Sequence, residues 1–99
     1  MVAGSVWAVR FRDRHLSYGD ACAIARRVFA AGSWRPVHLH LTETTATSTA
    51  ALARLILLRR ELLGRGGDLR LVGLKGRAEA LYEINRLDKL LPRVPSAES

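Results

Sequence analysis

The sequence predicts a small α/β domain whose strands and helices follow each other in the order β-α-β-α-β-α. Short segments with apolar residues at every second position, typical of strands, alternate with longer segments whose apolar residues recur at helical spacing. Strands that are separated by helices need crossover connections, which make neighbouring strands parallel. Because such crossovers are right-handed, we expect a small mixed, largely parallel sheet with the helices mainly on one face.

The first strand is predicted over residues 6–11, where the alternation places Trp7, Val9 and Phe11 on one face. The polar residues 12–15 follow it, and their composition predicts a turn. The strand therefore offers one apolar face to a core and ends in a polar connection.

A first helix is predicted over residues 21–31. Ser17 and Asp20 are both candidates for its amino-terminal cap, because either side chain accepts hydrogen bonds from the free backbone N–H groups there. Gly32 is typical of the position that follows the end of a helix.

The second strand is predicted over residues 37–41, where apolar residues and histidines alternate strictly. His38 and His40 face away from the core in this pattern. They could share a metal ion, but no cysteine or carboxylate lies at a ligand spacing from them, so we expect no metal site. If this sheet face is uncovered, the histidines would join Arg10 and Arg70 in an anion-attracting surface.

A polar, threonine-rich loop over residues 42–49 leads into the strongest predicted helix, residues 49–63, which has a wide apolar face. Glycines 64, 66 and 67 end that helix. The remaining predicted elements are a strand over 69–74, a helix over 77–86 and a short element over 87–91.

Length and composition fit one domain with a single modest core, since the chain has 99 residues of which 48% are apolar. We expect the domain to span residues 1–92 and a polar tail to span residues 93–99. The single cysteine, Cys22, excludes an internal disulfide and favours a reducing compartment.

The sequence has neither the apolar run of a membrane span nor the pattern of a signal peptide at its start. Its longest apolar run, residues 55–58, is far below the roughly 20 residues that cross a bilayer. We therefore expect a cytoplasmic protein without membrane insertion.

The formal net charge of +7 comes from arginines that are dispersed along the chain and are most frequent in its first third. A positive surface attracts polyanions, so an anion or nucleic-acid binder remains one alternative. The chain has no basic tail or run, which disfavours nucleic acid. It also lacks a supported Ser-His-Asp or Cys-His pattern, so we expect no enzyme, no catalytic residues and no cofactor.

From residue 37 to residue 91 the chain resembles the STAS domain family, whose name covers sulfate transporters and antagonists of anti-sigma factors. The family pattern runs from an L-D-L strand through D-S-S-G-L and an apolar helix to a G-G turn, a strand ending in V-G and a helix ending in G-L-x-x-L. The matching segments here, in order, are Leu39-His40-Leu41, Ser48-Thr49-Ala50-Ala51-Leu52, Gly66-Gly67, residues 69–74 and residues 86–91.

The chain departs from the family pattern in its functional loop and at its start. Ser48 replaces the acidic residue, Ala51 replaces the glycine, and Ala50 takes the place of the serine that antagonists commonly phosphorylate. Other members use the first hydroxyl position, which is Thr49 here. STAS domains usually begin with two strands, whereas the sequence predicts one before the first helix. That leaves a sheet edge that a partner or a second copy, in a homodimer, would cover.

The resemblance implies a non-enzymatic, protein-binding regulatory module of the anti-sigma factor antagonist type, whose partner is a kinase-like anti-sigma factor. It would dock through the loop and helix start over residues 42–52. Thr49 and Ser48 are the candidate phosphorylation sites, and the alternative is that one of these two hydroxyls serves only as the helix cap. The candidate partner-binding residues are Thr42, Glu43, Thr44, Thr45, Thr47, Ser48, Thr49 and Leu52.

The same resemblance supports a second function, that of an accessory STAS subunit of an ABC-type lipid transporter, with the ATPase subunit as partner. That class carries threonine at the position of Thr49. The identity of the partner would separate the two functions.

Overall fold

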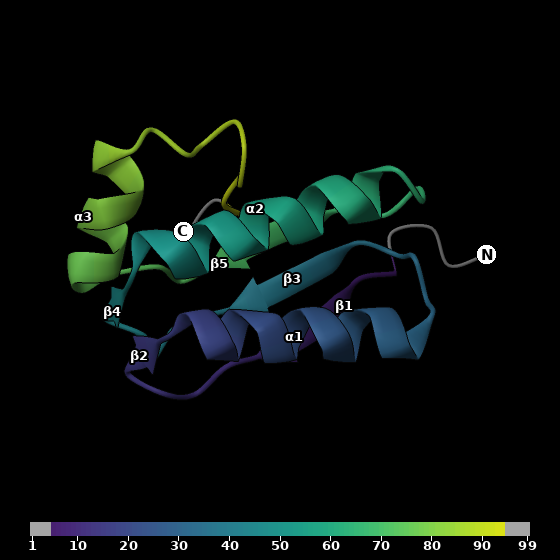
Figure 1. Ribbon diagram of the computed structural model, residues 1–99, viewed down its shortest axis with the longest axis horizontal. Helices are drawn as coiled ribbons and strands as arrows, with labels where there is room; N and C mark the ends of the chain where they lie inside the picture. The colour runs from purple at the N-terminus through teal and green to yellow at the C-terminus, as the bar shows by residue number, and fades with distance from the viewer. Residues whose placement is uncertain (1–4, 95–99) are drawn as a thin grey trace.

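The computed structural model describes residues 5–94 and confirms the predicted α/β domain with parallel strands (Figure 1). Two very short strands accompany the predicted elements. In chain order the elements are β1 (Trp7–Arg10), β2 (His15–Leu16), α1 (Tyr18–Ala31), β3 (Val37–His40), β4 (Ala46–Thr47), α2 (Thr49–Leu63), β5 (Leu69–Val72) and α3 (Gly76–Ile84).

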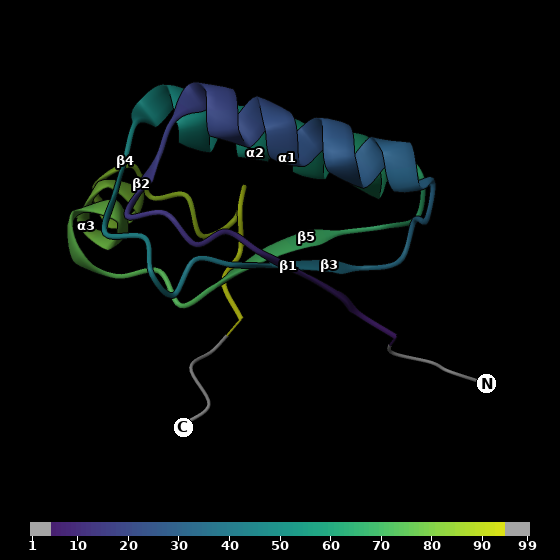
Figure 2. The ribbon, with the colours of Figure 1, turned by 90° about the horizontal axis from the view of Figure 1, so that it is seen from below.

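The main sheet has the strand order β1-β3-β5, and both pairings are parallel. Its register aligns Val9 with Leu39 and Leu39 with Leu71. Helices α1 and α2 contact each other and lie together over one face of this sheet, as Figure 2 shows from the side. The prediction that the helices lie mainly on one face is therefore confirmed.

One apolar core lies between the sheet and the two helices. The alternation predicted for the strands is observed, because the residues that face the helices are buried, except for partly buried Trp7 at the start of β1, while those on the other face stay partly or fully accessible. The fully buried side chains of this layer include Val9, Val37, Leu39, Leu69 and Leu71 from the sheet and Val28, Leu52, Leu55, Leu58 and Leu62 from the helices.

Helix α1 begins three residues earlier than predicted because a capping box forms at its start. The Ser17 hydroxyl accepts a hydrogen bond from the Asp20 backbone N–H at 3.0 Å, and the Asp20 carboxylate accepts one from the Ser17 N–H at 3.0 Å. These contacts with Ser17 lower the pKa of Asp20. Ser17 is thus the cap, and Gly32 ends the helix in the left-handed conformation, as predicted.

Residues 12–15 do not form only a turn, as the sequence predicted, because His15 belongs to β2. This strand pairs in parallel with β4, where His15 aligns with Ala46 and Leu16 with Thr47. Strands of two residues are too short to show a period-2 pattern, which is why they escape prediction from sequence. Two strands thus precede α1, but β2 belongs to a separate two-stranded sheet, and β1 remains at the edge of the main sheet, as expected from the sequence.

The carboxyl-terminal residues run beside β5 and pair with its edge. Leu71 donates its N–H to the Pro92 carbonyl at 2.9 Å and accepts from the Val94 N–H at 2.8 Å. The residues expected as a polar tail from position 93 therefore begin with backbone contacts to the sheet. The Tyr82 hydroxyl, buried at the end of α3, donates to the Leu91 carbonyl at 2.7 Å and holds the preceding turns in place.

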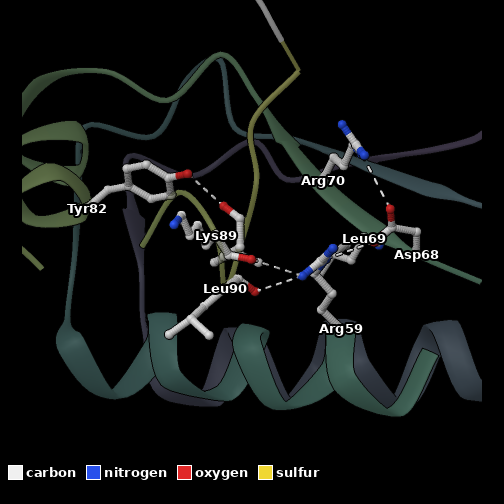
Figure 3. Close-up of polar contacts among 8 residues, drawn as sticks. Arg59, Asp68, Leu69, Arg70, Tyr82, Lys89 and Leu90 are labelled. Carbon is white, nitrogen blue, oxygen red and sulfur yellow. Dashed lines mark hydrogen bonds and ion pairs between the residues drawn. The ribbon is translucent and has the colours of Figure 1, made fainter. Parts of the chain in front are cut away.

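A polar network joins α2, β5 and this carboxyl-terminal segment (Figure 3). Arg59 on α2 donates to the Asp68 carboxylate at 2.8 Å and to the carbonyls of Lys89 and Leu90 at 3.3 Å each. Asp68 also accepts from the Leu69 N–H at 2.7 Å. One partly buried carboxylate thus fixes a guanidinium that in turn binds the backbone carbonyls of Lys89 and Leu90.

Gly73 ends β5 with a φ of +81° and lies directly against Thr42. We expect Gly73→Ala to lower the free energy of unfolding by more than Gly66→Ala does. The control, Gly66, has a similar φ of +87° but open space where a Cβ would stand. Its substitution therefore measures only the backbone strain of a positive φ, about 1–2 kcal/mol. Urea denaturation of both variants measures the difference, and equal losses would contradict the close packing against Thr42.

The Asp68 carboxylate makes the stability of the fold depend on pH. Burial alone would raise its pKa, but hydrogen bonds from the Leu69 N–H and from Arg59 outweigh burial and lower it. A carboxyl group with a lowered pKa stabilises the fold above its unfolded pKa, near 4, and loses that effect as the pH falls through the folded value.

We therefore expect Asp68→Asn to be less stable than the wild type at pH 7 and to lose less of its stability between about pH 5 and pH 2. Urea denaturation at a series of pH values measures both effects. Asp88→Asn, at an exposed position, controls for removing a carboxylate in general. If the wild type and Asp68→Asn lose equal stability at acid pH, the pH dependence does not come from Asp68.

Candidate functional site

The loop after β3 and the start of α2 lie at the end of the molecule where the parallel strands terminate and both long helices begin (Figure 1). The two-residue strands β2 and β4 and the helix α3 lie at the same end, and α3 contacts β4. The candidate site is therefore surrounded by β2, β4, α3 and the start of α2, which meet at one end of the domain.

Two threonine hydroxyls fasten the loop to the segment that follows β1. Thr44 is completely buried, and its Oγ1 donates to the Asp13 carbonyl at 2.9 Å. The Oγ1 of Thr47 donates to the Leu16 carbonyl at 2.8 Å. Because buried hydroxyl groups are costly to leave unpaired, these bonds select one conformation of a loop that has little apolar surface.

Backbone hydrogen bonds hold the same loop from two further sides. The N–H groups of Thr45 and Ala46 both donate to the Arg14 carbonyl, at 2.9 and 3.1 Å. The Thr45 carbonyl accepts from the Ala78 N–H of α3 at 2.9 Å. Gly76, at the start of α3, has a φ of +62° and lies so close that a Cβ there would stand 3.2 Å from the Thr45 oxygen. The loop is therefore fixed on both flanks.

The structure divides the residues predicted for partner binding into two groups. Thr42, Glu43, Thr45 and Thr49 are exposed, and Thr47 and Ser48 are half-buried. Thr44 and Leu52 are buried, at 0% and 1% exposure, so they support the surface from below and have no access to a partner. We call the exposed and half-buried residues of this set the docking surface: Thr42, Glu43, Thr45, Thr47, Ser48 and Thr49.

The two candidate phosphorylation sites differ in their surroundings. Ser48 is the amino-terminal cap of α2, and its Oγ accepts a hydrogen bond from the Ala51 N–H at 3.0 Å. Thr49 is the first residue of the helix and is exposed, as is Ala50 beside it. The hydroxyl of Thr49 is thus the more accessible of the two, and it stands at the positive end of the helix dipole.

A small cleft opens beside the docking surface, between the carboxyl ends of β1 and β3. Its volume is about 90 Å³, and its lining consists of Arg10, Phe11, Arg12, His40, Thr42 and Glu43. The sequence grouped Arg10 and His40 on one sheet face but did not bring Arg12 or Glu43 to them. The predicted parallel order of the strands could have located this cleft, because ligands of parallel sheets bind beyond the carboxyl ends of the strands.

Within residues 5–94, no three side chains of His, Cys, Asp or Glu gather into a group that could hold a metal ion. Among the same residues, no helix is both long and apolar enough to cross a bilayer.

The parallel sheet, the two helices on one of its faces and the helix start behind a threonine-rich loop define a STAS-like fold. No family model matches the chain, and no curated protein matches it in sequence. Solved structures do match: the crystal structure of a candidate anti-sigma factor antagonist from Thermotoga maritima, TM1081, superposes with a TM-score of 0.72 at 16% identity, covering 92% of this chain and 81% of that one.

The NMR structure of TM1081 gives the same result, with a TM-score of 0.76 at 15% identity, over 99% of this chain and 80% of that one. At so low an identity the likeness concerns the fold, since it shows how the backbone runs and leaves the surface chemistry to be argued from this chain's own residues.

The buried hydroxyl of Thr44 provides a test of how the loop is held. We expect Thr44→Val to lower the free energy of unfolding by about 1–2 kcal/mol, because the Asp13 carbonyl loses its partner. Thr45→Val, at the exposed neighbouring position, should change it by less than about 0.5 kcal/mol. Chemical denaturation of both variants measures the contrast, and a similar cost at the two positions would rule out the anchoring role.

Proposed function

We propose that this protein is a non-enzymatic, cytoplasmic regulatory module of the anti-sigma factor antagonist type, which docks on a kinase-like anti-sigma factor through the docking surface. The observation that carries the proposal is an exposed, polar loop and helix start held rigidly on a STAS-like fold that is also the fold of TM1081. Docking through a rigid loop requires little further ordering, which reduces the entropic cost of association.

A phospho-switch at Thr49 is part of the proposal. A phosphate there would carry about −1.5 to −2 charges at neutral pH and would stand beside the free N–H groups of the first helical turn. Because the helix dipole favours negative charge at this end, the fold tolerates the group and the main change falls on the docked partner. Ser48 is the second candidate, with its oxygen already engaged in the cap.

The accessory subunit of an ABC-type lipid transporter is the second candidate function. The exposed hydroxyl of Thr49 beside Ala50, which has none, favours it. The resemblance supports the same choice, because this class can carry threonine at the position of Thr49. The transporter's ATPase subunit would then occupy the same docking surface. Both functions need a protein partner at one site, so a binding measurement with the two kinds of partner decides between them.

We expect Thr49→Glu to weaken binding to the cognate kinase-like anti-sigma factor by tenfold or more, because the added carboxylate imitates part of the phosphate charge. Isothermal titration calorimetry with purified anti-sigma factors from the same genome measures the affinity. Ala30→Glu, which adds the same charge at an exposed site near the far end of α1, is the matched control and should bind like the wild type.

Incubation of the complex with ATP should add phosphate to Thr49, detected by mass spectrometry, and Thr49→Val should abolish the signal. An equal loss of affinity in Ala30→Glu would overturn the proposed docking surface. Tight binding to a purified ABC transporter ATPase subunit and none to any anti-sigma factor would replace the first function with the second.

A further inference from the structure

The cleft beside the docking surface gathers positive and hydrogen-bonding groups from two neighbouring strands. Arg10 ends β1, Arg12 follows two residues later, and His40 ends β3, where it aligns with Arg10 in the register of the sheet. Thr42 and Glu43 form the rest of the polar lining. Two arginines and a histidine therefore line one small cleft at the carboxyl edge of a parallel sheet.

The two arginines of the cleft have no carboxylate partner among residues 5–94. The ion pairs of this part of the chain use Arg59, Arg70 and Arg93, and none involves Arg10 or Arg12. Glu43 lines the same cleft without pairing with either arginine. The planar guanidinium fork matches the oxygens of phosphate and carboxylate groups, so both arginines are available to an incoming anion.

The size of the cleft limits what it can hold. Its volume of about 90 Å³ exceeds that of a few water molecules but is well below the roughly 300–1,000 Å³ of pockets that enclose a whole small molecule. A single tetrahedral oxyanion fits this scale, whereas a complete nucleotide does not. Thr42, which also lines the cleft, is a residue whose hydroxyl can donate a hydrogen bond.

We propose that this cleft is a binding site for one phosphate-class oxyanion, held by Arg10, Arg12 and His40. The site is distinct from the proposed docking function, because it needs no protein partner and its ligand is a small anion. Glu43 opposes the anion electrostatically and keeps the affinity low enough for exchange. The phosphate could be free or could end a small ester, and both share the chemistry that the cleft recognises.

His40 provides a reporter for the bound anion. Burial, then Arg10, then His38 lower its pKa, which favours the neutral imidazole in the free protein. The charged groups around it are Arg10 and Arg12 on one side, Glu43 in the loop, His38 on the same strand and Arg70 on β5. An anion in the cleft favours the protonated imidazole, so binding raises the pKa of His40 and strengthens as the pH falls through it.

The test is an NMR titration of the full chain with inorganic phosphate at pH 6.5 and constant ionic strength, followed at the His40 ring and at the amides of Arg10 and Arg12. We expect saturable shifts at pH 6.5, and a rise in the His40 pKa when the ring is followed over a series of pH values with and without phosphate. Arg10→Gln and Arg12→Gln should each weaken binding about tenfold, and Glu43→Gln should strengthen it. Arg26→Gln, at an exposed position of α1 on the opposite face of the sheet, removes the same charge away from the cleft, is the matched control and should leave the affinity unchanged.

A parallel titration with methyl phosphate distinguishes the two sources of the phosphate group. Tighter binding of methyl phosphate assigns the end of an ester, and tighter binding of inorganic phosphate assigns the free ion. Shifts that do not saturate, shifts that chloride reproduces at equal ionic strength, or unchanged shifts in folded Arg10→Gln and Arg12→Gln would overturn the site. Retained phosphate binding without any protein partner would leave this site in place even if the docking function fails.

Discussion

The parallel crossover is the constraint on which the rest of this structure depends. Each strand of the main sheet enters a connection that leads to the start of a helix, so strand ends and helix starts share one end of the molecule. The apolar layer between sheet and helices then fixes how those ends stand relative to each other. The docking surface, the start of α2 and the cleft are neighbours because of this geometry, although residues 10 and 49 are far apart in sequence.

The threonines of the loop have two different roles: some donate hydrogen bonds that hold the loop, and others form its exposed surface. The hydroxyls of buried Thr44 and half-buried Thr47 donate to carbonyls of the segment after β1, and each bond adds about 0.5–1.5 kcal/mol of net stability. Thr42, Thr45 and Thr49 stay exposed. Because the two hydrogen bonds fix the backbone, the exposed residues present a surface of defined shape without an apolar anchor of their own.

Sequence reasoning succeeded where a pattern is long enough to be periodic. Helix α2 has the predicted bounds, Thr49–Leu63, and the alternation of β3 correctly assigns its core face. It missed β2 and β4, since two residues show no period and their pairing joins distant segments. It also could not tell Thr44 from Thr45, because a threonine-rich loop has no repeat. The sequence analysis also counted Leu52 among the partner-binding residues, although it shares the apolar spacing of Leu55, and that spacing indicates the buried position that the structure shows.

Electrostatics connects the cleft to the docking surface. In physiological salt the field of an exposed charge falls off over about 8 Å, so only neighbouring charges affect a docked partner strongly. Thr42 and Glu43 belong to both the cleft and the docking surface, and Glu43 is the only charged residue of the latter. An oxyanion that neutralises Arg10 and Arg12 would therefore change the potential that a partner meets at this end, while the other arginines, spread over the domain, would contribute mainly to its general positive charge. The net charge alone therefore does not locate a binding site in this sequence, whereas the arginines at the carboxyl end of β1 are the ones that would act on an anion or a partner at this end.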